Sequence, residues 1–286
     1  MTTPAPPKPP FVRRAWLAVR RRIVPYSILY VLVVGGFMWF ENTLVFRACT
    51  AAESWRAPHD MVAEDARFKS ADGTELHGWW VPPTKPGAGA FLFSHGNGGN
   101  LSHRGSLARA LTQLTGEGIL LYDYPGYGHS GGVPSEAGCY ASADAAYDWL
   151  TAKVPPNRVV ILGESLGGGV AVDLASRKDH RALVLFCTFT TLPAAAKGRF
   201  PFLPTHTMMR NRFDSLSKID RCRRPTFIAH GTNDWTVPFR LGEELFAAAP
   251  GPKEFLRVEG AGHNDILRKD VYRAVAAFLE THPTAD

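Results

Sequence analysis

A short apolar run that leads into a serine between glycines limits the fold of this chain more than any other feature. Val159–Leu162 is entirely apolar and rich in β-branched residues, which is typical of a strand buried on both faces. Gly163-Glu164-Ser165-Leu166-Gly167 follows, and then a helix-like run to Ala175. A strand that turns sharply into a helix through Gly-x-Ser-x-Gly presents its serine above the sheet on a strained backbone. We therefore predict a nucleophile elbow at Ser165, and the alternative is a glycine-rich turn with a bystander serine.

The rest of the chain alternates strand-like and helix-like segments after an opening hairpin. Two strand-like runs flank Asp72-Gly73, a dipeptide that favours a tight turn between antiparallel strands. Later strands are expected at residues 90–94, 118–122, 158–162, 182–186, 226–229 and 254–258, with helices at 102–114, 136–150, 240–249 and 267–279. This order predicts an α/β fold with a mainly parallel eight-stranded sheet and helices on both faces.

The net charge of +6 originates at the N-terminus. The first 40 residues contain no acidic residue and six basic ones, namely Lys8, Arg13, Arg14, Arg20, Arg21 and Arg22. The remaining chain has 26 basic and 26 acidic residues and is neutral overall. Because no basic excess remains for a folded surface, we expect no nucleic-acid partner.

An uncharged run follows these arginines. Ile23–Phe40 has 18 residues, about the minimum for a helix that spans the hydrocarbon core of a membrane. The flanking arginines predict a cytoplasmic N-terminus. A cleaved signal peptide is the alternative, but the run is long for one and no clear Ala-x-Ala cleavage site follows. We expect an uncleaved single-pass anchor, with the folded domain on the non-cytoplasmic side.

Four segments are expected along the chain. Residues 1–22 read as a basic disordered N-terminus, residues 23–42 as the signal anchor and residues 43–61 as a polar connector. Residues 62–286 form the α/β domain, within which residues 188–222 are irregular, proline-containing and suited to a short cap.

The cysteines indicate no metal or redox motif. Cys49, Cys139, Cys187 and Cys222 are widely separated and form no Cys-x-x-Cys pair. The glycine patterns that bind dinucleotides or nucleotide phosphates are also missing from the sequence. We therefore expect no cofactor and no metal, and leave disulfide pairing open.

A serine hydroxyl is a poor nucleophile and needs a base, which in turn needs an orienting carboxylate. In a parallel sheet such groups gather after the carboxyl ends of strands. His263 follows the strand that ends at Val258, and Asp234 follows the strand that ends at Ala229. The chain order Ser165, Asp234, His263 is the order of the α/β-hydrolase triad.

Other residues near strand ends are weaker candidates. His95 is expected to shape its loop, and His230 is too close to its strand to reach over the serine. Asp265 is expected to cap the last helix, Asp123 to brace its own loop, and Glu164 to lie under the elbow.

The negative oxygen of a tetrahedral intermediate needs preplaced hydrogen-bond donors. The N–H of Leu166 at the start of the helix is one candidate. The second is expected at Asn97, where Gly98-Gly99 leave room for a substrate carbonyl, unless this loop is a plain glycine-rich turn.

Together these motifs resemble those of the membrane-anchored α/β-hydrolase-domain proteins, a group of bacteria and eukaryotes whose relatives include protein depalmitoylases and serine aminopeptidase-like hydrolases. The resemblance covers about residues 25–280 and rests on five motifs in order, which are His95–Asn100 with His103-Arg104, Asp123–Gly128, the elbow, His230–Asp234 and Gly262–Asp265. It implies the α/β-hydrolase fold and a serine hydrolase with the triad already derived. Pro125 departs from relatives that often carry arginine there.

The substrate is less constrained. A short cap with apolar side chains at Leu192, Phe200, Phe202, Leu203, Met208 and Met209 suits acyl chains, although these residues could equally pack the cap onto the domain. We expect an esterase or thioesterase acting on a small or lipid-like acyl ester, or on an acylated protein. A prolyl-oligopeptidase-like peptidase and a non-catalytic binding protein on the same fold are the alternatives.

Overall fold

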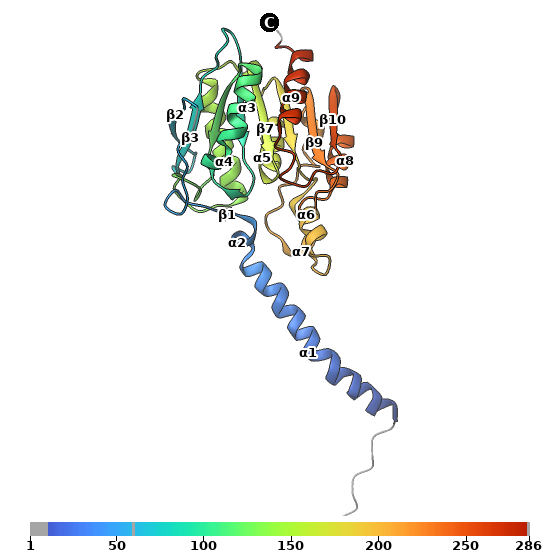
Figure 1. Ribbon diagram of the computed structural model, residues 1–286. Coiled ribbons are helices and arrows are strands. Elements are labelled where there is room, and N and C mark those ends of the chain that lie inside the picture. Colours follow the sequence, from blue (N-terminus) through green and yellow to red (C-terminus); the bar gives the residue numbers. More distant parts are fainter. Residues whose placement is uncertain (1–10, 59–60, 285–286) are drawn as a thin grey trace, which may run out of the picture. The chain divides into compact units, whose positions relative to one another are not determined.

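The computed structural model describes residues 11–58 and 61–284 (Figure 1). The chain divides into two compact units, Met1–Glu41 and Asn42–Asp286.

The first unit contains one long helix, α1 (Phe11–Trp39). Within it, Val19–Trp39 is long and apolar enough to cross a membrane, and a signal sequence would have the same character. The disorder expected through residue 22 is wrong for residues 11–22, which are helical. Arginine, alanine and leucine have high helix propensity, so the helix extends N-terminally beyond the apolar run. The disorder expected for residues 1–10 lies outside the described residues.

The second unit is built on an eight-stranded sheet (Figure 1). Its strand order is β10-β9-β8-β7-β4-β6-β3-β2. The strands are β2 (Glu64–Lys69), β3 (Glu75–Val81), β4 (Ala90–Ser94), β6 (Gly118–Tyr122), β7 (Val159–Glu164), β8 (Ala182–Phe186), β9 (Thr226–Gly231) and β10 (Lys253–Val258). The β2–β3 hairpin is antiparallel and joins β6 in antiparallel fashion, whereas the strands from β6 to β10 are parallel. The predicted mainly parallel sheet of eight strands is confirmed.

The sheet is buried on both faces because alternate residues of the central strands enter two separate cores. In β4, Ala90 and Leu92 belong to one core and Phe91 and Phe93 to the other. This alternation explains why the strands are continuously apolar in sequence.

Helices cover the two faces in two groups. One face is covered by α4 (Glu136–Thr151), α5 (Leu166–Ala175) and α8 (Phe239–Ala248), whose buried side chains share the first core. The other face is covered by α3 (Gly105–Thr115) and α9 (Lys269–Thr281). Short 3-10 turns lie at η1 (Leu101–Arg104), η2 (Pro156–Arg158) and η3 (Ile219–Arg221).

The expected polar connector is in fact packed against the α/β domain. After α2 (Glu41–Val45), strand β1 (Arg47–Ala48) pairs in parallel with β5 (Gly98–Gly99). Phe46 is buried, and its ring lies 6.2 Å from the ring of Phe213. Residues 43–48 therefore belong structurally to the second unit, because one apolar side chain and a two-residue strand fasten them to it.

The segment between β8 and β9 contains α6 (Leu192–Arg199) and α7 (Thr205–Met208), where the sequence indicated irregular structure. Thr191 caps α6 by accepting a hydrogen bond from the N–H of Ala194. Both helices are short, Pro193 lies in the first turn of α6 and Pro204 directly precedes α7, so their sequence lacks the long periodic pattern that identifies a helix.

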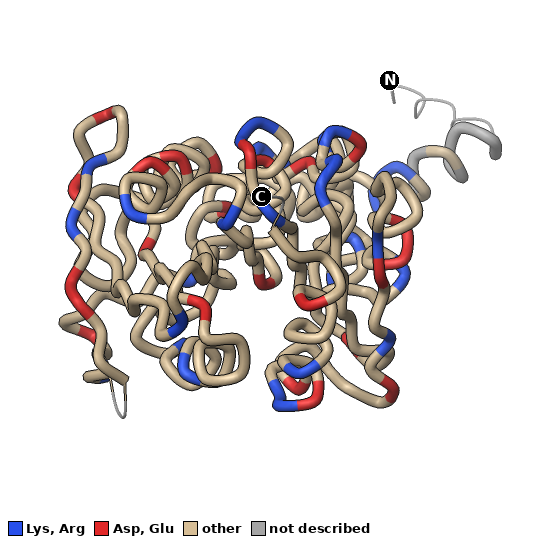
Figure 2. Tube along the Cα trace, turned by 90° about the horizontal axis from the view of Figure 1, so that it is seen from above, with Lys and Arg blue, Asp and Glu red and all other residues tan. Residues whose placement is uncertain are grey.

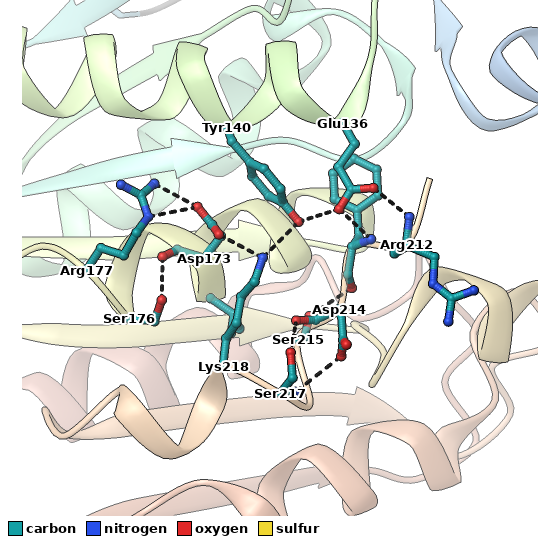
Figure 3. Close-up of polar contacts among 12 residues, drawn as sticks. Glu136, Tyr140, Asp173, Ser176, Arg177, Arg212, Asp214, Ser215, Ser217 and Lys218 are labelled. Atoms are coloured by element: carbon teal, nitrogen blue, oxygen red, sulfur yellow. Dashed lines mark hydrogen bonds and ion pairs between the residues drawn. The ribbon is translucent and has the colours of Figure 1, made fainter. Parts of the chain in front are cut away.

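A polar network fastens the end of this segment to α4 and α5 (Figure 3). Lys218 Nζ lies 2.8 Å from Asp173 Oδ1 and 3.3 Å from Tyr140 Oη. The Tyr140 hydroxyl donates to Glu136 Oε1 at 2.8 Å. Glu136 also accepts hydrogen bonds from the backbone N–H groups of Arg212 and Phe213. One carboxylate on α4 thus satisfies two backbone donors of a segment far away in the sequence.

Charged residues of both signs are interspersed around the second unit (Figure 2). Lys and Arg positions and Asp and Glu positions both occur on every side of this unit in the view.

Candidate active site

The elbow places Ser165 between β7 and α5 on a strained backbone. Its φ is 53° and its ψ is −116°, a conformation that residues with a side chain rarely adopt. The strain is held by hydrogen bonds from Ser165 N to Phe186 O at 2.8 Å and from Thr188 Oγ1 to Ser165 O at 2.9 Å. The surrounding sheet therefore fixes the position of the serine.

The two glycines of the motif are needed because the turn is tight. A Cβ atom on Gly167 would overlap the carbonyl oxygen of Ser94, and one on Gly163 would lie 2.5 Å from the carbonyl oxygen of Gly167. Real Cβ atoms essentially never approach an oxygen this closely. The close packing of the elbow thus requires glycine at both of these positions.

The structure brings together Ser165, His263 and Asp234, which are far apart in the sequence. His263 Nε2 lies 2.9 Å from Ser165 Oγ, and His263 Nδ1 lies 2.6 Å from Asp234 Oδ2. The imidazole comes from the loop after β10 and the carboxylate from the loop after β9. With Nδ1 donating to the carboxylate, Nε2 is left as the acceptor for the serine proton.

Both oxygens of Asp234 are held in place. Oδ1 accepts hydrogen bonds from the N–H groups of Thr236 and Val237, each at 2.8 Å. Oδ2 faces His263 and also lies 3.2 Å from Nε2 of His230. The carboxylate is thus fixed by donors from its own loop and from the end of β9.

These contacts keep Asp234 ionised. Burial acts to raise the pKa of the Asp234 carboxyl, but hydrogen bonds from His230 and His263 and the charge of His263 outweigh it and hold that pKa well below its ordinary value. The site therefore contains a fixed negative charge behind the imidazole.

The two residues whose N–H groups are expected to bind the oxyanion, Leu166 and Asn97, both lie near Ser165. Leu166 begins α5 directly after the serine, and Asn97 lies beside Ser165 in the loop after β4. Within the described residues, neither backbone N–H donates a hydrogen bond to another protein group. The side chain of Asn97 has a different partner, since its Nδ2 donates to Val45 O at 2.9 Å.

A cavity of about 440 Å³ opens at Ser165 and His263. Its lining is mostly polar and consists of Arg47, Gly96, Asn97, Gly98, Arg104, Glu164, Ser165, Thr236, His263, Asn264 and Leu267. Glu164 lies beside this cavity and pairs with Arg104, whose Nε is 2.9 Å from Glu164 Oε2. Sequence reasoning missed both arginines, because nothing in the motifs marks Arg47 or assigns Arg104 a place near the serine.

The cap residues do not line this cavity. Leu203 and Met208 are buried, Leu192 and Met209 pack against the core, and Phe202 is exposed. The packing alternative for these side chains therefore fits the structure better than an acyl-chain lining around Ser165.

Within the described residues, those that sequence reasoning gave as weaker candidates for the site make no hydrogen bond to Ser165 Oγ or to the ring of His263. His95 is buried, with Nδ1 2.7 Å from Gly96 O and Nε2 3.3 Å from Asp123 Oδ1. Asp123 also accepts from the N–H of Leu101 at 2.8 Å, so it braces the neighbouring loop rather than only its own. Asp265 accepts from Gly262 N within the loop of His263, whereas Arg268 occupies the N-cap of α9, so the expected cap at Asp265 is wrong.

One group of described residues could by distance hold a metal ion. Atoms of Cys187, His230 and Asp234 lie within 4.8 Å of one another and are buried. Burial raises the pKa of the Cys187 thiol, which disfavours the thiolate that a metal would need. The oxygens of Asp234 already accept from His263 and from two backbone N–H groups, so this cluster fits a hydrogen-bonded support for the imidazole.

All four cysteines are free thiols in the structure. Cys139, Cys187 and Cys222 are buried and Cys49 is partly exposed.

Comparison with known proteins identifies relatives of the whole domain. Residues 89–206 match the model of the α/β-hydrolase fold family. An uncharacterized protein of Mycobacterium tuberculosis is 38% identical over 253 residues, covering 86% of this chain and 90% of that protein. The α/β-hydrolase domain-containing protein 17B of Xenopus laevis is 39% identical over 177 residues, which is 61% of this chain and 60% of the relative.

Solved structures share the fold. An esterase of Pyrococcus furiosus superimposes with a TM-score of 0.68 at 21% identity, covering 83% of this chain and 98% of the esterase. The topology, the match to the family model and the extent of the sequence similarity agree, and the chain belongs to the α/β-hydrolase-domain protein family.

Proposed function

We propose that this protein is a serine hydrolase that cleaves carboxylic esters or thioesters through Ser165, His263 and Asp234. The observation that carries the proposal is the continuous chain of contacts from Asp234 Oδ2 to His263 at 2.6 Å and from His263 to Ser165 Oγ at 2.9 Å. Hydroxyl, imidazole and carboxylate in this order form a nucleophile, a general base and an orienting group.

In the proposed reaction, Ser165 Oγ attacks the acyl carbon while its proton moves to His263 Nε2. The N–H groups of Asn97 and Leu166 would stabilise the oxyanion, since their donors are free and flank the serine. His263 then gives its proton to the leaving alcohol or thiol, and the acyl-enzyme remains on Ser165. Water, deprotonated by the same imidazole, attacks the acyl carbon, the bond from that carbon to Ser165 Oγ breaks, and His263 returns the proton to Oγ as the acid leaves.

Asp234 contributes by holding the imidazole tautomer. The low pKa of its carboxyl keeps a negative charge beside Nδ1 throughout the ordinary pH range, which stabilises the imidazolium formed during attack. No cofactor or metal is needed for these steps.

A Pyrococcus furiosus esterase shares the fold of this protein, and we propose esters as the first substrates to test. We further propose that α1 anchors the protein in a membrane, with the N-terminus in the cytoplasm and the catalytic unit on the other side. Arg20, Arg21 and Arg22 at the start of the apolar stretch favour this orientation.

The test uses the full chain in detergent with a p-nitrophenyl ester series, a thioester series and an aminoacyl-amide series. We expect the wild type to hydrolyse esters or thioesters. The Ser165→Ala variant should show no turnover above background, and its circular dichroism spectrum should match that of the wild type. Hydrolysis restricted to amides would instead identify a peptidase, and an inactive but folded wild type on all three series would contradict the proposal.

A further inference from the structure

We infer that Arg47 makes the active site selective for esters that carry an anionic oxygen group, such as a carboxylate or a phosphate, near the scissile bond. The inference rests on the proposed hydrolase function and extends it to the class of substrate.

The backbone fixes Arg47 at the mouth of the site. Arg47 pairs with Gly98 in the short β1–β5 sheet, directly beside the loop of Asn97. On its two sides, Val45 O accepts from Asn97 Nδ2 at 2.9 Å and Cys49 O accepts from Gly128 N at 2.9 Å. Because the chain is held before and after it, Arg47 is presented to the cavity that contains Ser165 and His263.

Within the part of the chain that the structure describes, no carboxylate neutralises the charge of Arg47. The other arginine of the cavity, Arg104, pairs with Glu164 at 2.9 Å and donates from Nη2 to Gly98 O at 3.1 Å. Arg47 is exposed and, among the described residues, has no carboxylate within ion-pair distance. Among the described residues of the lining, Arg47 is therefore a cation without an ion-pair partner.

A guanidinium presents a planar fork of N–H donors that matches carboxylate and phosphate oxygens. Within the lining, the carboxylate of Glu164 is paired with Arg104, and Ser165 contacts His263. The remaining polar side chains, Asn97, Thr236 and Asn264, are neutral. A substrate with one anionic group would thus gain an interaction that a purely aliphatic ester cannot make. This chemistry also agrees with the mostly polar wall around Ser165.

The experiment compares matched esters in which a carboxylate is replaced by a neutral group. On the leaving-group side, para-acetoxybenzoate is compared with para-acetoxybenzamide. On the acyl side, the p-nitrophenyl hemiester of adipic acid is compared with p-nitrophenyl hexanoate. Full-length wild type in detergent is expected to show a higher kcat/KM for the anionic member of at least one pair, and this preference should fall as salt is added.

Variants at Arg47 connect the preference to the guanidinium. Arg47→Gln should lower the ratio of anionic to neutral kcat/KM about tenfold, the effect of one charge-assisted hydrogen bond at an exposed position. Arg47→Lys keeps the charge and should retain part of the preference for the anionic ester. Arg223→Gln removes the same charge from an exposed residue outside the cavity and should leave the ratio unchanged.

A phosphate analogue, para-acetoxyphenyl phosphate, distinguishes the two anions. A larger Arg47-dependent preference for this compound than for para-acetoxybenzoate would assign phosphate-bearing substrates, and the reverse would assign carboxylates. Equal turnover of anionic and neutral esters, or a preference that survives in Arg47→Gln, would overturn the inference while leaving the hydrolase function intact. Failure of the folded wild type to hydrolyse any of the esters would instead count against the proposed function.

Discussion

At the scale of single residues, the proposed chemistry depends on how firmly the carboxylate of Asp234 is held. Its four hydrogen-bond partners fix both oxygens and leave one tautomer of His263 favoured. His230, which sequence reasoning set aside as a base, lies 3.2 Å from the carboxylate, and we expect it to position that carboxylate.

Replacing the Asp234 carboxylate with an amide keeps the shape of the side chain and removes its negative charge. Asp234→Asn keeps the size of the side chain but reverses the preferred tautomer of His263, so we expect kcat to fall on the order of 10³–10⁴-fold. Ester turnover measures the loss, and circular dichroism checks that the fold is retained. A loss below about tenfold would show that the imidazole does not depend on Asp234.

The residues of this site could be predicted from the sequence because the parallel sheet gathers them. Chain order and strand ends were enough to select Ser165, Asp234 and His263. Arg47 could not be found in this way, since its place depends on a two-residue strand that pairs with a loop about 50 residues later. Such a short strand has no periodicity, and only the tertiary fold stabilises it.

At the scale of elements, the elbow requires a strand and a helix to approach so closely that only glycine fits. Gly167→Ala would force a methyl group into the carbonyl oxygen of Ser94. We expect a loss of roughly 3 kcal/mol or more in unfolding free energy, measured by chemical denaturation. Gly105→Ala, where a Cβ has open space at the start of α3, is the control and should be neutral or slightly stabilising. Equal stability of the two variants would mean that the elbow can relax.

The segment between β8 and β9 depends on Glu136 for its attachment. Glu136→Ala leaves the N–H groups of Arg212 and Phe213 and the hydroxyl of Tyr140 without their acceptor. We expect a cost of about 1–3 kcal/mol and faster tryptic cleavage within residues 188–222. Glu244→Ala breaks only an exposed ion pair with Arg240 and should change neither quantity measurably. Unchanged cleavage in Glu136→Ala would show that apolar packing alone holds the segment.

The regular elements were predictable from the sequence where they are long and apolar. The eight strands of the sheet follow from the alternation of strand-like and helix-like runs. A strand such as β4 is recognisable because its neighbouring residues enter opposite cores, which makes the whole run apolar. Helices α6 and α7 and the helical start of α1 were not predicted. The first two are short, with Pro193 inside α6 and Pro204 directly before α7. The residues added to α1 intersperse five arginines with apolar residues, which interrupts the uncharged run.

At the scale of the whole molecule, the described residues form the long helix α1 and an α/β unit that begins at Asn42. All contacts described for the proposed site lie within residues 42–286. Membrane attachment and catalysis should therefore be separable by deletion.

Removal of residues 1–41 is expected to release the protein from membranes while turnover of soluble esters continues. Full-length protein should stay in the pellet after carbonate extraction, since an apolar helix of this length partitions into the bilayer. The distribution is measured by immunoblotting of both fractions. Full-length protein in the carbonate supernatant would contradict the anchor.

The central claim, that Ser165 is the nucleophile, is tested most directly by covalent labelling with a fluorophosphonate followed by peptide mass spectrometry. The account predicts a single adduct on the peptide that contains Ser165, no adduct in Ser165→Ala and much slower labelling in His263→Ala. An adduct at a different residue, or no adduct on a folded wild-type protein, would contradict it.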